Sequence, residues 1–378
     1  MDSATLNTAA YWESAETDLR LHPRRPLDVS GLSDFLQRQC QVEASIVLPT
    51  SGTSGGAKFV VLPKTALLVS AAAVNQHLGA SREDRWLAGL ADFHVGGLGI
   101  YARSYLSGSP VVTIPWDSWG GNGRDFVHAI ESHGITLTSL TPTHLHDLVR
   151  DGCPAPSSLR AVLLGGGRIE ERLVSAARAL GWPIRASYGM TEAASQIATA
   201  VCDEIDELPI LPHWQCRIEL NGRLALRGPA LFSGYAERVD GRWIYRTGNE
   251  AEGWFVTGDR CAIHNGFLKF LGRADDLVKI SGELVSLGDL DHLASGMAQA
   301  LGSDAAVVAV PDARREHALI VVVEGSEIDR SSFLKTLNHA LSGIEQIREI
   351  HPVEALPRTA LGKVDRAVLV EWIRRDLP

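Results

Sequence analysis

Cysteine is scarce in this sequence, with five residues among 378 and no paired or metal-type spacing. An odd number of widely separated cysteines argues against a disulfide framework and against a cysteine-based metal site. The first residues are acidic and polar before any apolar stretch, unlike the basic-then-apolar order of a secretory signal. We therefore expect a cytoplasmic protein in a reducing compartment.

Positive charge and long apolar runs are also in short supply. The formal net charge of −9 gives no general attraction to phosphate backbones or anionic lipid surfaces. An apolar run such as residues 66–74 falls far short of the roughly 20 residues that a helix needs to cross a bilayer. Nucleic acids and membranes are thus not expected as partners.

What the sequence does have is a large apolar fraction, 45%, arranged in three successive patterns. Strand-like and helix-like stretches alternate through residues 45–200, which predicts layered α/β structure with largely parallel sheets. Short strands with Gly turns over residues 215–272 predict a small β subdomain. The remainder predicts a small α+β unit. We expect an N-terminal domain over residues 1–274 and a mobile C-terminal α+β lid domain over residues 275–378, joined by a short hinge.

Residues 50–58, TSGTSGGAK, follow an apolar stretch and have the chemistry of a phosphate-binding loop. Glycines let the backbone approach an anion, hydroxyls donate hydrogen bonds to phosphate oxygens and Lys58 adds positive charge. The spacing differs from a Walker A loop, because Lys58 is followed by Phe59 rather than Ser or Thr. Taken alone, such a loop is equally well a surface turn.

Four further segments follow the loop in order: residues 188–192 (YGMTE), 254–259 (WFVTGD), 272–283 (GRADDLVKISGE) and 357–366 (PRTALGKVDR). This ordered set resembles the motifs of the adenylate-forming superfamily, which includes acyl-CoA synthetases, luciferases and carrier-protein adenylation domains. The resemblance spans residues 50–366. It implies an enzyme that activates a carboxylic acid with ATP and Mg²⁺ and then passes the acyl group to coenzyme A.

The resemblance also implies a role for each motif residue. Lys363 would bridge the substrate carboxylate and the α-phosphate, with Thr191 bonding a phosphate oxygen and Glu192 holding Mg²⁺. Asp259 would bind the ribose, and Arg273 the ribose or a phosphate. The remaining ATP-binding residues would be Thr50, Ser51, Gly52, Thr53, Ser54, Gly55 and Lys58 at the phosphates, and Gly165, Gly166, Gly167, Tyr188, Gly189 and Met190 near adenine.

Several of these residues also fit ordinary structural roles. The three glycines also fit a tight exit from a strand, and Tyr188 also fits core packing. Asp275 matches the hinge position of the family, and Gly282 would face the pantetheine channel. The alternative is that Asp275 and its neighbour Asp276 are solvated acids of the hinge region.

A second resemblance concerns the acid. His94 follows Asp92 and Phe93 as in the acyl pocket of CoA ligases, and Arg103 stands nine residues later in an apolar stretch. With Ser195 and Gln196 after the 188–192 motif, this pattern resembles the o-succinylbenzoyl-CoA synthetases of menaquinone biosynthesis, a branch of the superfamily. Arg103 would hold the carboxylate that is not activated, because a buried guanidinium needs an anionic or hydrogen-bonding partner. A structural salt bridge is the alternative.

One departure from the superfamily is that only 49 residues precede the phosphate loop, fewer than in most members. We expect a reduced first subdomain and a homodimer partner over the surface thereby left open. Three other functions are also compatible with the sequence: a ligase for another aryl or acyl acid, a stand-alone enzyme that loads a carrier protein, and a nucleotide-binding relative that has lost catalysis.

Overall fold

The computed structural model describes residues 3–24, 27–50, 58–115, 123–202, 204–248, 251–312, 314–325, 328–358 and 364–376. Their contacts define two compact units. The first holds nearly all described residues up to Phe270. The second holds Gly258–Arg260 together with the described residues from Leu271 onward. No helix within these ranges is long and apolar enough to cross a membrane.

The first unit contains a six-stranded sheet in which neighbouring strands are parallel except at β9. The strand order is β5 (Val111–Thr113), β4 (Trp86–Ala88), β6 (Leu137–Leu140), β7 (Ala161–Leu164), β8 (Ile184–Met190) and β9 (Ser195–Thr199). The predicted α/β alternation with largely parallel strands is confirmed.

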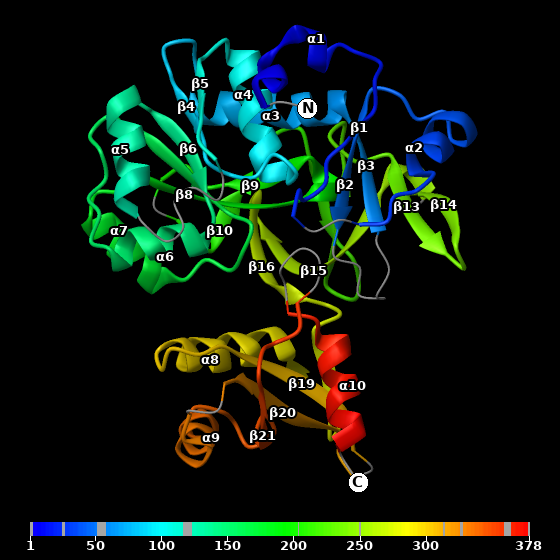
Figure 1. The fold of residues 1–378 in the computed structure, drawn as a ribbon, viewed down its shortest axis with the longest axis vertical. Coiled ribbons are helices and arrows are strands. Elements are labelled where there is room, and N and C mark those ends of the chain that lie inside the picture. The colour runs from blue at the N-terminus through cyan, green and yellow to red at the C-terminus, as the bar shows by residue number, and fades with distance from the viewer. Residues whose placement is uncertain are drawn as a thin grey trace. The chain divides into compact units, whose positions relative to one another are not determined.

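Helices cover both faces of this sheet, as Figure 1 shows. The helices are α3 (Lys64–Leu78) and α4 (Val95–Ser107) on one face, and α5 (Gly123–His133), α6 (Pro142–Arg150) and α7 (Glu171–Ala179) on the other. Successive residues of β7 enter opposite cores, with Leu163 in the first and Val162 and Leu164 in the second. Burial on both faces explains why these strands are continuous apolar runs.

Two further sheets and two short N-terminal helices complete the first part of the chain. One sheet has the order β1 (Asp18–Leu19), β2 (Ser45–Thr50), β3 (Lys58–Pro63), β13 (Gly234–Val239), β14 (Arg242–Thr247), and the other β10 (Glu207–Pro209), β16 (Phe267–Arg273), β15 (Phe255–His264), β12 (Arg223–Arg227), β11 (Gln215–Ile218). The helices are α1 (Ala9–Trp12) and α2 (Leu32–Asp34). The strands of residues 215–272 are therefore divided between two sheets, because β13 pairs with β3.

The second unit is built around a three-stranded sheet of β19 (Ala305–Asp312), β20 (Glu316–Glu324) and β21 (Ile347–Val353), with a hairpin of β17 (Leu277–Ile280) and β18 (Glu283–Ser286). Helices α8 (Leu287–Gln299) and α9 (Arg330–His339) cover one face of the sheet and α10 (Arg366–Asp376) covers the other. This is the α+β unit that the sequence predicts.

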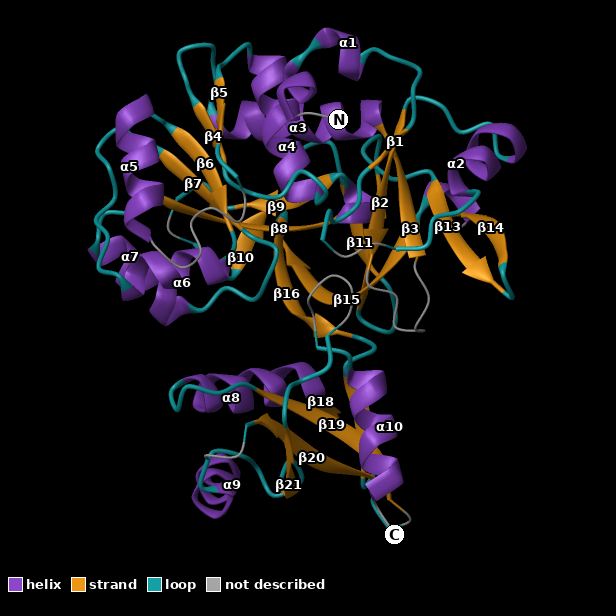
Figure 2. Cartoon of the chain, in the orientation of Figure 1, coloured by secondary structure: helices purple, strands orange, loops and turns teal. Residues whose placement is uncertain are grey.

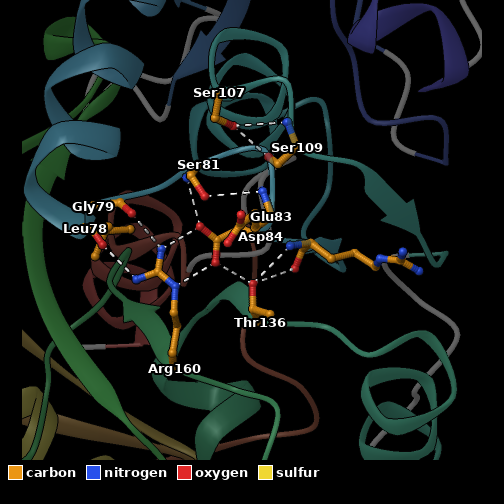
Figure 3. Close-up of polar contacts among 10 residues, drawn as sticks. Leu78, Gly79, Ser81, Glu83, Asp84, Ser107, Ser109, Thr136 and Arg160 are labelled. Atoms are coloured by element: carbon orange, nitrogen blue, oxygen red, sulfur yellow. Dashed lines mark hydrogen bonds and ion pairs between the residues drawn. The ribbon is translucent and has the colours of Figure 1, made fainter.

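A polar cluster ties together the amino-terminal edge of the six-stranded sheet (Figure 3). Arg160, just before β7, binds both carboxylate oxygens of Asp84 at 2.6 and 2.7 Å, and Thr136, just before β6, donates to Asp84 at 2.8 Å. Burial by itself would raise the pKa of Asp84, but the hydrogen bonds from Arg160, Ser81 and Thr136 outweigh it and hold that pKa below its ordinary value. The cluster is a structural brace at the sheet edge opposite the predicted site.

Candidate active site at the carboxyl edge of the parallel sheet

Figure 2 shows the strands of the six-stranded sheet as arrows, and several predicted residues of the first unit follow their carboxyl ends in the sequence. His94 lies after β4, Gly165–Gly167 after β7, and Thr191 and Glu192 directly after β8. Strand order reverses between β4 and β6, since β4 leads to β5 on one side and β6 leads to β7 on the other. Open α/β sheets bind ligands outside the carboxyl ends of their strands, at such a switch point.

The three glycines leave β7 in a tight turn. The Gly165 N–H donates to the Leu140 carbonyl at 3.2 Å, and a Cβ at position 165 would lie 2.6 Å from Ser187 Oγ. Gly166 has φ of +80°, which disfavours other residues. The glycines therefore do form a tight exit from the strand. Because they carry no side chains, their backbone is also accessible at the carboxyl edge of the sheet.

The segment Tyr188–Met190 is held by its pairing with β9. Gly189 faces Gln196 beside a bulge, and a Cβ there would lie 1.5 Å from the Ser195 carbonyl oxygen, so that only glycine fits. The half-buried Tyr188 ring lies 5.7 Å from the Phe270 ring at an interplanar angle of 32°. Met190 is half-buried against the main core.

Glu192 lies in a short 3₁₀ turn, Thr191–Ala193, and is fixed at two atoms. Its carbonyl oxygen accepts from the Phe232 N–H at 2.9 Å, and its Oε1 accepts from the Tyr235 hydroxyl at 2.9 Å. Thr191 is half-buried beside it. Tyr235 lies on β13, far from the predicted motifs, and no local pattern in the sequence singles it out.

The surroundings of Glu192 fit a magnesium ion bound with a nucleotide. Within the described ranges no cationic side chain pairs with its carboxylate, and no group of three or more His, Cys, Asp or Glu side chains forms a metal cage. Mg²⁺ is commonly held by one or two carboxylates together with substrate phosphates rather than by an all-protein cage. Among the described residues, the one hydrogen-bond donor to this half-buried carboxylate is the neutral Tyr235 hydroxyl, which suits that role.

The phosphate-loop segment connects β2 to β3, whose end residues Thr50 and Lys58 are directly paired. Ser51, Gly52, Thr53, Ser54 and Gly55 lie outside the described residues. The Lys58 Nζ atom stands 3.4 Å from the centre of the Tyr235 ring, so that its charge is directed over an aromatic face.

The predicted acyl-site residues differ in exposure. His94 is exposed at the N-cap position of α4, 4.8 Å from the buried Phe93 ring, and the Asp92 carboxylate accepts from Arg20 at 3.0 Å. Ser195 is half-buried with φ of +96°. Gln196 is buried, and its Oε1 accepts from the Thr199 hydroxyl at 2.5 Å.

Arg103 is fully buried on α4 and has no carboxylate within ion-pair distance among the described residues. One terminal nitrogen donates to Ser139 Oγ at 3.3 Å, and the guanidinium carbon lies 4.9 Å from the Trp86 ring centre. The Nε atom has no hydrogen-bond partner within the described ranges. Burial lowers the pKa of Arg103 to about 9. The described residues therefore provide no acidic partner for the alternative, a structural salt bridge of Arg103.

In the second unit, Arg273 joins two of the predicted acids. It donates to the buried Asp259 at 3.2 Å and to both carboxylate oxygens of Asp275 at 2.8 and 2.9 Å. The hydrogen bonds that Arg273 donates to Asp275 raise the pKa of Arg273 above its ordinary value. Gly282 has φ of +88° and donates from its N–H to Glu316 at 2.9 Å.

Lys363 lies outside the described residues, but the chain on either side of it is anchored. Arg358 forms a β-bridge with Val364, and the Asp365 N–H donates to the Pro357 carbonyl at 2.7 Å. Arg366 binds Asp276 at 3.2 Å and Asp291 at 2.7 Å. The residues on both sides of Lys363 are thus held by these contacts.

The AMP-binding enzyme family model matches residues 36–236, more than half of the chain and all of the edge described above. This chain belongs to the AMP-binding enzyme family. The 2-succinylbenzoate–CoA ligase of Bacillus cytotoxicus is 31% identical over 348 residues, which cover 86% of this chain and 70% of that protein.

Solved structures of AMP-binding enzymes agree with the fold. The o-succinylbenzoate CoA synthetase (MenE) of Bacillus subtilis, in complex with its acyl-adenylate intermediate, matches with a TM-score of 0.73 and 26% identity over 86% of this chain and 68% of that one. The same enzyme in complex with ATP and magnesium ion matches with a TM-score of 0.72 and 26% identity, over 85% and 69% of the two chains. The expected superfamily and its layered α/β fold are confirmed.

Proposed function

We propose that this protein is an ATP-dependent, AMP-forming ligase that converts o-succinylbenzoate to its coenzyme A thioester, a step of menaquinone biosynthesis. Similarity to o-succinylbenzoate–CoA ligases across most of the chain supports the reaction class. The observation that carries the choice of a dicarboxylic acid is Arg103, a fully buried guanidinium without a carboxylate among the described residues.

The physical argument rests on the cost of burying charge. Burying an unpaired ion costs several kcal/mol, so a guanidinium is kept in such a place when an anion joins it. The unactivated carboxylate of o-succinylbenzoate would supply that charge. Its binding would also orient the aromatic acid while the other carboxylate reacts near His94, at the carboxyl edge of the sheet. Ser195 and Gln196 would lie along the acyl pocket.

The remaining residues have roles in two half-reactions. Glu192 would hold the Mg²⁺ that neutralises phosphate charge, and Thr191 would bond a phosphate oxygen. Lys363 would stabilise the charge that develops between the attacking carboxylate and the α-phosphate. Thr50, Lys58 and the segment between them would bind the outer phosphates. Residues 165–167 and 188–190 would lie along adenine.

The domain division 1–274 and 275–378 belongs to the same proposal. Adenylation must exclude water, whereas thioester formation must admit a thiol, so a lid that changes position between the two steps serves both. Asp259 and Arg273 would bind the ribose. Asp275 would act as the hinge, with Gly282 at the coenzyme A channel.

The test is a competition assay with ATP, Mg²⁺ and coenzyme A. We expect o-succinylbenzoate to form a thioester with a kcat/KM at least about 100-fold above that of benzoate, because a buried charge-assisted contact contributes on the order of 3 kcal/mol. Medium-chain fatty acids and other aryl acids serve as further competitors. Preference for a monocarboxylic acid would refute the substrate. An acyl-adenylate that forms but never reaches free coenzyme A would refute the ligase and indicate a carrier protein as acceptor.

A further inference from the structure

Tyr235 stands between two residues of the active-site edge that are distant in the sequence. Its hydroxyl donates to Glu192 Oε1 at 2.9 Å, and the Lys58 Nζ atom stands 3.4 Å from its ring centre. One phenol therefore contacts both the carboxylate after β8 and the lysine that ends the phosphate-loop segment.

Strand register explains how Tyr235 reaches these partners. β13 runs antiparallel to β3, with Tyr235 opposite Val60 and Glu237 opposite Lys58. Because side chains alternate along a strand, Lys58 and Tyr235 project from the same face as diagonal neighbours. The Phe232 ring packs edge-on against Tyr235 at 4.6 Å, and the Phe232 N–H holds the Glu192 carbonyl at 2.9 Å.

We propose that Tyr235 is a positioning residue for the metal-binding carboxylate of Glu192. This inference rests on the magnesium role proposed above. A phenol fixes the rotation of the carboxylate through Oε1 and leaves Oε2 for the ion. A lysine or arginine at this place would do the same but would neutralise the charge that attracts Mg²⁺. The Lys58 ammonium lies over the ring of the same phenol.

The test separates the hydroxyl from the ring. Tyr235→Phe keeps the aromatic face under Lys58 and removes only the donor to Glu192. We expect the Kd of Mn²⁺, measured by electron paramagnetic resonance in the presence of a non-hydrolysable ATP analogue, to rise about 10-fold, as is common when a residue supporting a metal ligand is lost. The affinity for the ATP analogue without metal should not change. Tyr235→Leu removes the ring as well and should weaken that affinity too.

A matched control is Tyr105→Phe, which also removes a hydroxyl that donates to a carboxylate, Glu13 at 3.0 Å on the exposed surface. This variant should bind Mn²⁺ as the unaltered protein does. A double-mutant cycle distinguishes positioning from general destabilisation. In a Glu192→Gln background, Tyr235→Phe should change the Kd of Mn²⁺ no further.

Two results would overturn the proposal: an unchanged Kd of Mn²⁺ in Tyr235→Phe, or an equal rise with and without Glu192. Because metal binding is measured without any acid, failure of o-succinylbenzoate as the substrate leaves this test intact. The two failures are therefore distinguishable.

Discussion

At the residue scale, burial changes what a side chain can do. Arg103 is charged in nearly every protein environment, yet here burial lowers its pKa to about 9 and no carboxylate among the described residues compensates it. A buried guanidinium without a carboxylate partner among these residues can pair with a bound anion. The same burial makes the residue a poor contributor to stability on its own.

Replacing Arg103 with methionine should separate binding from folding. We expect the KM for o-succinylbenzoate to rise roughly 10- to 100-fold, because a hydrogen bond to a charged group contributes on the order of 1.5 to 3 kcal/mol. The KM for ATP and the melting temperature should stay close to those of the unaltered protein. Steady-state kinetics with both substrates, and with a monocarboxylic aryl acid as the control, test this. An equal rise in KM for the two acids would contradict a role in binding the second carboxylate.

We expect His213 to make the stability of the protein sensitive to mild acid. Among the described residues neither of its ring nitrogens has a hydrogen-bond partner, and burial lowers its pKa from 6.5 to about 4. Between these values the unfolded chain binds a proton that the folded protein does not. Stability should therefore fall as the pH falls from about 6.5 towards 4, by at most about 1.4 kcal/mol per pH unit from this residue.

His213→Leu should reduce that slope, because the substitution removes the proton that only the unfolded chain binds. Urea unfolding at pH 7 and pH 5 measures the effect. His128→Gln, at an exposed position, is the control and should keep the slope of the unaltered protein. An unchanged slope in His213→Leu would show that other groups account for the acid sensitivity.

At the scale of elements, the two edges of the six-stranded sheet are specialised. The carboxyl edge holds the predicted site, whereas the amino edge holds the Asp84–Arg160 brace of Figure 3. Arg160 also donates to the carbonyls of Leu78, the last residue of α3, and Gly79, its C-cap, at 2.7 and 3.3 Å. The brace therefore connects the end of one helix with the starts of three strands, at the sheet edge opposite the predicted site.

Asp84→Asn should lower stability without altering catalysis. We expect a loss of about 1.5 kcal/mol in the free energy of unfolding, because the substitution weakens charge-assisted hydrogen bonds to the buried Asp84 carboxylate, whereas the Arg160 side chain is exposed to solvent. Urea denaturation measures the loss. Asp34→Asn, which breaks the exposed pair with Arg38, should cost less than about 1 kcal/mol. A changed KM for ATP or for the acid in Asp84→Asn would contradict a purely structural role.

Elements themselves were largely predictable. The sequence predicted alternating strand-like and helix-like stretches through residues 45–200, and the structure has that alternation, with α3, α4 and α5 among its helices. The pairing of β13 with β3 was not predictable. Local pattern identifies a strand, whereas the choice of partner depends on packing between segments far apart in the chain.

At the scale of the whole molecule, the proposed chemistry divides between half-reactions. Lys363→Ala should abolish formation of the acyl-adenylate, because no other charge would bridge the two reacting groups. Thioester formation from preformed acyl-adenylate and coenzyme A should be retained. Pyrophosphate release and thioester formation, measured separately, test this. Lys335→Ala, an exposed lysine on α9, should affect neither step. Equal loss of both steps would contradict the role of Lys363.

Contiguous motifs were sufficient to recognise the family and to name the candidate residues, since the identity and spacing of nearby side chains are written directly in the chain. Which side chains meet was decided by strand order and register. Tyr235 reaches Glu192 across 43 positions, and Asp92 reaches Arg20 across 72. Likewise, apolar neighbours predicted that Arg103 is buried, but only packing determined that no carboxylate of the described residues pairs with it. Such contacts depend on how separate segments come together, which no local pattern specifies.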